Sequence, residues 1–170
     1  RKAENAGSVD AFNYFLGKYP DAAQAKIATD ERNALAYKQT QEANTFAAYK
    51  SFVDNYPDAV QYEEAKKKLG ILAFDEAAKK HTLEAIEQFM EQYPNSPKMP
   101  DAKVMKRQLL FEWAKSVNSI EAYNKFVSQY PEGEMFIDIF NLKSAALGQS
   151  IAADLPMENY KVLRGFDNKQ

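Results

Sequence analysis

The chain has 170 residues, of which 45% are hydrophobic and 27% charged, and its formal net charge is −2 at pH 7. This length and composition predict one globular domain with a sizeable apolar core, and the charge gives no electrostatic signature of binding to nucleic acid or an anionic membrane. The absence of Cys excludes disulfides, thiolate zinc sites and a cysteine nucleophile.

The first residues carry the signal of a helix that ends early. Residues 1–6 precede Gly7, a residue type that ends helices, and are predicted to form the last turns of a helix. The chain begins with Arg1 rather than Met, so we expect any signal peptide or lipid anchor to lie upstream. No apolar run approaches the roughly 20 residues of a membrane-spanning helix, so no transmembrane segment is predicted.

Four short helices of about 11 residues are predicted from a pattern that recurs every 37 residues. Each ends at a Tyr-Pro pair, because Pro does not continue a helix comfortably. Phe stands four residues before each Tyr, a large apolar residue seven before and Ala eight before, which together form one face of a helix. This spacing marks the aromatic residues as core and not as a cofactor site. The pairs are Tyr19-Pro20, Tyr56-Pro57, Tyr93-Pro94 and Tyr130-Pro131, and the Phe residues are Phe15, Phe52, Phe89 and Phe126.

The start of each short helix is marked by a hydroxyl residue eleven positions before the Tyr. Such a side chain accepts a hydrogen bond from a backbone N–H of the first turn. The residue before each cap is of a type that tolerates the left-handed conformation in which helices end. We therefore expect one helix to stop directly before the next begins. The caps are Ser8, Thr45, Thr82 and Ser119, and the preceding residues are Gly7, Asn44, His81 and Asn118.

A longer helix of about 20 residues is predicted after each Tyr-Pro pair. Ser96 and Pro97 form a cap and first-turn pair at one of these starts. Apolar residues then recur on one face: Ala65, Leu69, Leu72, Ala73, Phe74 and Ala77 in the second unit, and Ala102, Met105, Leu109, Leu110, Phe111 and Ala114 in the third.

These units predict an all-α fold, because a short and a long helix cannot bury their apolar faces alone whereas stacked pairs can. We predict an α-solenoid of four 37-residue helix-turn-helix repeats in one domain spanning residues 1–170. The repeats are predicted at residues 8–44, 45–81, 82–118 and 119–154, followed by a degenerate C-terminal capping helix at 155–165.

The repeats resemble the tetratricopeptide repeat superfamily, most closely the variant of bacterial outer-membrane assembly lipoproteins and periplasmic cell-division coordinators. The resemblance covers residues 8–151, although the repeat has 37 residues rather than the usual 34 and lacks the Trp-Leu-Gly opening. It implies a right-handed solenoid that scaffolds other proteins, in the bacterial periplasm or at the outer-membrane periphery. The variant's motif is seen in Ala85, Phe89, Tyr93, Pro94, Ser96 and Ala102.

Catalytic chemistry is not predicted. His81, the one histidine, occupies the turn position shared by Gly7 and two Asn residues, so a turn role is favoured over catalysis. No Ser-His-Asp arrangement, metal-ligand spacing or Gly-rich phosphate loop accompanies it. We predict no enzyme activity, no catalytic residue, no metal site and no cofactor.

A partner-binding surface is predicted on the short helices, at positions nine, five and two before each Tyr. In the resembling family this face lines a concave groove that grips peptides or partner domains. Acids outnumber Lys on it, so we expect a protein or peptide partner of basic or neutral character; a merely solvated acidic face is the alternative. The predicted groove residues are Asp10, Tyr14, Ser51, Asp54, Glu84, Gln88, Glu91, Glu121 and Lys125.

The leading functional hypothesis is a non-enzymatic scaffold for protein–protein contact in the bacterial envelope. The alternative hypothesis is a structural spacer that positions a catalytic or binding domain encoded beyond Gln170. The two hypotheses share one fold and differ in whether the exposed face of the short helices binds a partner.

Overall fold

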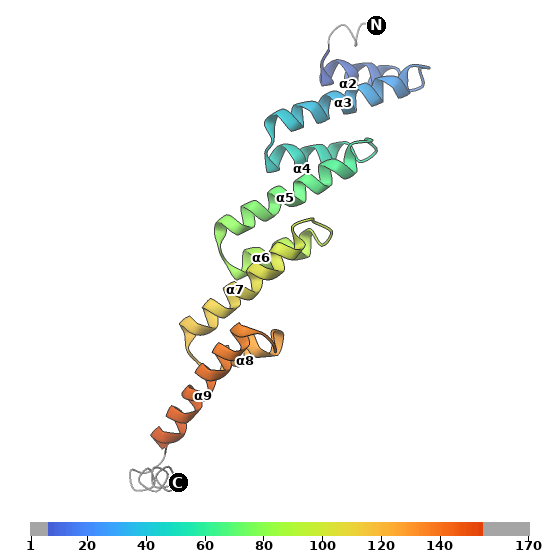
Figure 1. The fold of residues 1–170 in the computed structure, drawn as a ribbon. Coiled ribbons are helices and arrows are strands. Elements are labelled where there is room, and N and C mark those ends of the chain that lie inside the picture. The colour runs from blue at the N-terminus through green and yellow to red at the C-terminus, as the bar shows by residue number, and fades with distance from the viewer. Residues whose placement is uncertain (1–6, 155–170) are drawn as a thin grey trace. The chain divides into compact units, whose positions relative to one another are not determined.

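The computed structural model describes residues 7–154, and every regular element in this range is an α-helix. Short and long helices alternate along the chain (Figure 1). The predicted all-α class is therefore confirmed for the described residues. The short helices are α2 (Val9–Lys18), α4 (Phe46–Asn55), α6 (Leu83–Gln92) and α8 (Ile120–Gln129), and the long ones are α3 (Ala25–Ala43), α5 (Tyr62–Lys80), α7 (Met99–Val117) and α9 (Glu134–Asp154).

The chain divides into two compact units, Arg1–Ala102 and Lys103–Gln170, with the boundary inside α7. In the first unit α2 packs on α3, α3 on α4, α4 on α5 and α5 on α6. In the second unit α8 packs on α9. The helix predicted at residues 1–6 and the capping helix predicted at 155–165 lie outside the described residues.

The predicted N-caps are confirmed for all four short helices. Each cap residue has an extended backbone, and its hydroxyl oxygen accepts a hydrogen bond from the N–H of the Ala three residues on. The donor–acceptor distances are 3.1–3.2 Å. Each bond satisfies an N–H that has no partner within the helix, which is why the four helices begin at equivalent positions. The cap and donor pairs are Ser8 and Ala11, Thr45 and Ala48, Thr82 and Ala85, and Ser119 and Ala122.

The predicted left-handed residues are confirmed as well. Positive φ angles occur directly before each cap, at Gly7 (53°), Asn44 (45°), His81 (52°) and Asn118 (51°). Each short helix ends at its Tyr, whose N–H donates to the carbonyl of the repeated Phe at 2.9 Å. The following Pro has no N–H to donate, so the helix does not continue.

The repeated Phe forms the centre of the core. Phe52, Phe89 and Phe126 are only 1%, 3% and 0% exposed. Each ring lies between an aromatic residue of the preceding long helix and the Tyr that ends its own short helix. These three-ring clusters join consecutive helices within a unit: Tyr37, Phe52 and Tyr56; Phe74, Phe89 and Tyr93; and Phe111, Phe126 and Tyr130.

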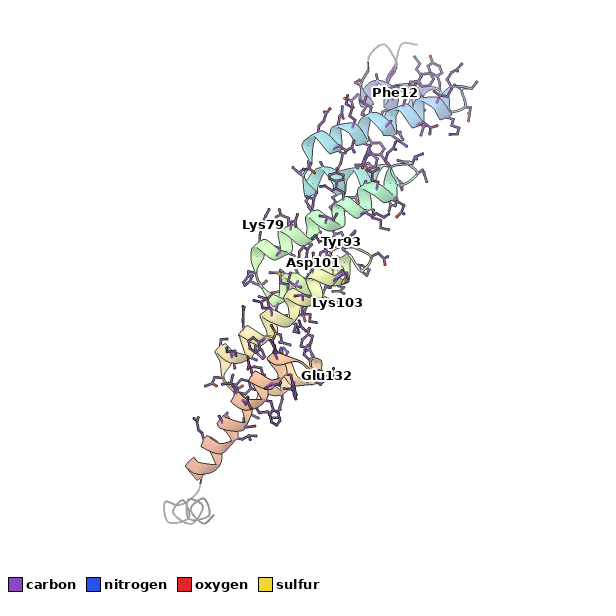
Figure 2. The ribbon with its side chains drawn as sticks, in the orientation of Figure 1. Phe12, Lys79, Tyr93, Asp101, Lys103 and Glu132 are labelled. Atoms are coloured by element: carbon purple, nitrogen blue, oxygen red, sulfur yellow. The ribbon has the colours of Figure 1, made fainter. Side chains whose placement is uncertain are left out.

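The repeated Phe is less buried in the first repeat than in the three later ones. Phe15 is half-buried, and its ring contact is with Tyr19, 5.7 Å away between centroids. Phe12 on α2 (Figure 2) is 5% exposed and is the buried residue of that helix. Phe15 is thus less buried than the equivalent Phe residues of the three later short helices.

The predicted start of the third long helix at Pro97 is wrong. Two tight turns precede α7, in which Ser96 N–H donates to Tyr93 O and Met99 N–H donates to Ser96 O, both at 3.0 Å. Ser96 Oγ accepts the N–H of Lys98 at 3.1 Å, so this hydroxyl caps the turn before the helix. The turn also packs closely on α5, because a Cβ at Gly70 would lie 2.9 Å from Ser96 Oγ.

Candidate partner-binding surface

All nine predicted groove residues are exposed and lie on the short helices. They occupy the side of each helix that faces away from the repeated Ala and Phe. Those on α2, α4 and α6 belong to the first unit, and those on α8 belong to the second. The surface is therefore described in two parts: Asp10, Tyr14, Ser51, Asp54, Glu84, Gln88 and Glu91 in the first, and Glu121 and Lys125 in the second.

Several of these residues contact neighbours on their own helix. Asp54 is ion-paired with Lys50 at 2.7 Å, with both side chains more than half exposed, and this carboxylate raises the pKa of the Lys50 amine. An exposed pair of this kind contributes little to stability. A hydrogen bond of 3.2 Å joins two predicted residues, from the amide of Gln88 to the carboxylate of Glu84.

The second unit contains an aromatic residue that the sequence reasoning missed. The ammonium of Lys125 on α8 lies over the indole ring of Trp113 on α7, 4.9 Å from its centroid. Trp113 is 37% exposed, and exposed Trp residues are enriched at protein interfaces. A comparison of the repeats could have identified this residue, because Trp113 stands where the earlier long helices carry Gln39 and Glu76.

A small pocket lies in the first unit between α2, α3 and α4, with a volume of about 250 Å³. Only one predicted groove residue, Ser51, lines it. Three of the other lining residues lie on α3, outside the short helices on which the surface was predicted. The lining is formed by Val9, Ala36, Gln39, Thr40, Ala48, Ser51, Phe52 and Tyr56.

His81 has a defined backbone role. It ends α5 in the left-handed conformation with φ 52° and ψ 41°, and its N–H donates to the carbonyl of Ala78 at 3.1 Å. The equivalent positions carry Asn44 and Asn118 in the same conformation. The predicted turn position is therefore confirmed.

We expect the backbone conformation to decide which residues are tolerated at position 81. His81→Val should unfold more easily than His81→Asn by about 1–3 kcal/mol, because a β-branched residue is strained in the left-handed region. Both variants lack the imidazole, so the comparison isolates the backbone effect. Urea unfolding followed by circular dichroism measures this difference. Equal stability of the two variants would contradict a conformational requirement at this turn.

Comparison with protein-family models and with curated protein sequences gives no match. Within residues 7–154, no cluster of three or more potential metal-binding side chains is found. None of the helices described there combines the length and apolar character needed to cross a membrane.

Proposed function

We propose that this chain is a non-enzymatic scaffold whose short helices bind a protein or peptide partner. Its four 37-residue helix-turn-helix repeats stack as a right-handed α-solenoid in this proposal. The observation that carries it is the exposure of all nine predicted groove residues on the side opposite the repeated core. Exposed side chains at equivalent positions of successive helices form the kind of extended surface that repeat proteins use for binding.

The charge of this surface favours a basic partner. Five of the nine residues are acids and one is Lys. Part of the charge is already compensated, because Asp54 is paired with Lys50. Glu84 and Glu91, both exposed on α6, are the acids best placed to contact a cationic segment. Electrostatic complementarity of this kind mainly speeds association.

The proposed location is the bacterial envelope, in the periplasm or at the outer-membrane periphery. The Tyr-Pro repeat motif and its resemblance to envelope scaffold proteins support it. An envelope extract is therefore the appropriate source of candidate partners.

Charge reversal on α6 tests the proposed function. Glu84→Lys combined with Glu91→Lys should change the free energy of unfolding by no more than about 1 kcal/mol, because both side chains are exposed. The same variant should lose partners that the wild-type chain captures from envelope extract. For a captured partner, it should also slow association and weaken the dependence of the association rate on salt.

The matched control reverses two acids on the long helices, Glu31→Lys with Glu63→Lys, which changes the net charge equally. This control should capture the same partners as the wild type. If the α6 variant and the wild type capture identical partners, the surface is merely solvated. The spacer that positions a further domain then becomes the better hypothesis.

A further inference from the structure

The long helix α9 exposes a leucine at a position that is buried in the other long helices. Leu147 is 40% exposed. One, two and three repeats earlier, the equivalent residues are Leu110, Ala73 and Ala36, which are 0%, 7% and 6% exposed. Leu110 is the same residue type and lies in the same unit as Leu147. The difference between them therefore reflects what covers the helix and not the side chain itself.

Two of the earlier long helices show what covers this position, which is the short helix that follows in the chain. Ala36 on α3 belongs to one core cluster with Tyr49 and Phe52 of α4. In the second unit the ring of Phe126 on α8 lies 5.7 Å from that of Phe111, which neighbours the buried leucine of α7. In the described part of the chain, no short helix follows α9.

The end of α9 lies where a connection to a further short helix is expected. The long helices α3, α5, α7 and α9 end at equivalent positions of the repeat: Ala43, Lys80, Val117 and Asp154. Two residues separate each of the first three ends from the next short helix. The same spacing after Asp154 places the first residue of a further short helix at Met157.

The sequence after α9 carries the apolar pattern of the short helices. Met157 stands at the first helical position, which is apolar in all four of them, and Glu158 follows where three of them carry an acid. Tyr160 stands at the position of a large apolar residue that is buried in every short helix. Leu163 stands at the position of the repeated Phe. Both residues that cover a preceding long helix thus have apolar equivalents in this segment.

The two positions that form the aromatic contact change together. In the three earlier pairs the repeated Phe contacts a Tyr or Phe ring of the preceding long helix. The equivalent of that ring on α9 is Gly148, and the equivalent of the Phe is Leu163. An aliphatic side chain at 163 needs no ring opposite it and can instead bury apolar area against the exposed Leu147.

We infer that the exposed face of α9 around Leu147 is the docking site of the chain's own residues 156–164, with Tyr160 and Leu163 against Leu147. The segment is joined to the end of α9, so covalent attachment keeps it at a high effective concentration beside this face. The inference goes beyond the proposed function, because it assigns this face to the chain itself and not to an external partner.

Nuclear Overhauser effects in the full chain test the contact directly. The methyl groups of Leu147 should give cross-peaks to the ring of Tyr160 and to the methyl groups of Leu163. An equimolar mixture of isotope-labelled and unlabelled chain separates contacts within one molecule from contacts between two copies. The absence of these cross-peaks would overturn the inference. Cross-peaks found only between molecules would also overturn it, since a second copy would then cover the face.

Neighbouring substitutions in the segment provide a matched comparison. Leu163→Ala should lower the hydrogen-exchange protection of the amides of residues 161–164 at least about tenfold, because most of the buried side chain is lost. Val162→Ala should leave this protection within about twofold. The equivalents of Val162 in three short helices are exposed: Ser51, Gln88 and Lys125. Equal effects of the two variants, or amides without protection in the wild type, would contradict the docking.

The contact is also tested from α9. Leu147→Ala should lower the same protection, and its combination with Leu163→Ala should lower it by less than the product of the two single effects, because each variant removes the same contact. Effects that multiply would mean that the two side chains do not touch, which overturns the inference. Circular dichroism verifies that each variant keeps the helical fold. The capture experiment with Glu84 and Glu91 concerns α6, so its outcome is independent of this one.

Discussion

Truncation of the repeated Phe should cause the largest loss of stability: Phe52→Ala and Phe89→Ala should each lower the free energy of unfolding by about 3–5 kcal/mol. Both side chains are almost completely buried, at 1% and 3% exposed. Phe52 lies 5.2 Å from the Tyr37 ring and 5.1 Å from the Tyr56 ring. Removing it would leave a cavity where two consecutive helices and the following turn meet.

Urea unfolding followed by circular dichroism measures these losses, and two variants calibrate them. Thr45→Ala should cost about 1 kcal/mol, because it removes one capping hydrogen bond of 3.2 Å. Phe15→Ala should cost less than Phe52→Ala, since Phe15 is only half-buried. If Phe52→Ala costs no more than Thr45→Ala, the three-ring clusters do not hold consecutive helices together.

The destabilisation caused by one such substitution should also remain local along the chain. In a repeat array each unit contacts mainly its neighbours, so an energetic change spreads over short distances. Hydrogen exchange of Phe89→Ala should show faster opening in α5 and α6, which pack together in the first unit, than in α2. Uniform loss of protection from α2 to α6 would instead indicate one cooperative core.

The features that were predicted best from the sequence were local ones. A hydroxyl cap, a left-handed residue before it and a Tyr-Pro pair each act within one helical turn, so their spacing fixes where a short helix begins and ends. Thr82 and Tyr93 accordingly stand at the two ends of α6, as the spacing predicted. The burial of Phe52, Phe89 and Phe126 also followed from the helical period.

The starts of the long helices were harder to predict. Gln24 and Gln61 precede α3 and α5 without a side-chain capping bond. These starts are set by the tight turns after each Tyr, in which Ala25 N–H donates to Ala22 O and Tyr62 N–H donates to Ala59 O. Such backbone turns impose only weak residue preferences. Ser96 was therefore predicted as a helix cap, although it caps the preceding turn.

The candidate site was predicted only in part. Its shape depends on side-chain size, which differs from repeat to repeat at positions that the 37-residue period makes equivalent. Exposure of Ser51 and Asp54 follows from helix geometry. The pocket beside Ser51 is lined on α3 by Ala36, whose equivalent in the third repeat is the larger Leu110. Trp113 occupies a position that carries polar residues in the earlier repeats, so the 37-residue period alone did not predict an exposed aromatic residue there.

A second large effect is expected at alkaline pH, from Tyr37. This residue is 7% exposed, and burial raises its pKa to about 12, with further contributions from the hydrogen bond to Glu64 and the charge of that carboxylate. An unfolded Tyr has a pKa of about 10. The stabilising contribution is therefore fully present below about pH 10 and is lost as the pH rises through about 12. A difference of about two pKa units corresponds to about 2–3 kcal/mol.

Tyr37→Phe should remove most of this alkaline loss, because the variant has no phenol to ionise in the unfolded chain. The free energy of unfolding, measured with urea below pH 10 and again as the pH approaches 12, should fall by about 2–3 kcal/mol less in the variant than in the wild type. Tyr14→Phe removes a hydroxyl from a side chain that is 69% exposed and serves as the matched control. Parallel pH profiles for Tyr37→Phe and the wild type would contradict the role assigned to the buried Tyr37.

A shared residual decline is expected from Tyr49, whose pKa is also raised by burial and by the charge of Glu64. Tyr37→Phe combined with Tyr49→Phe should therefore flatten the profile further than either change alone.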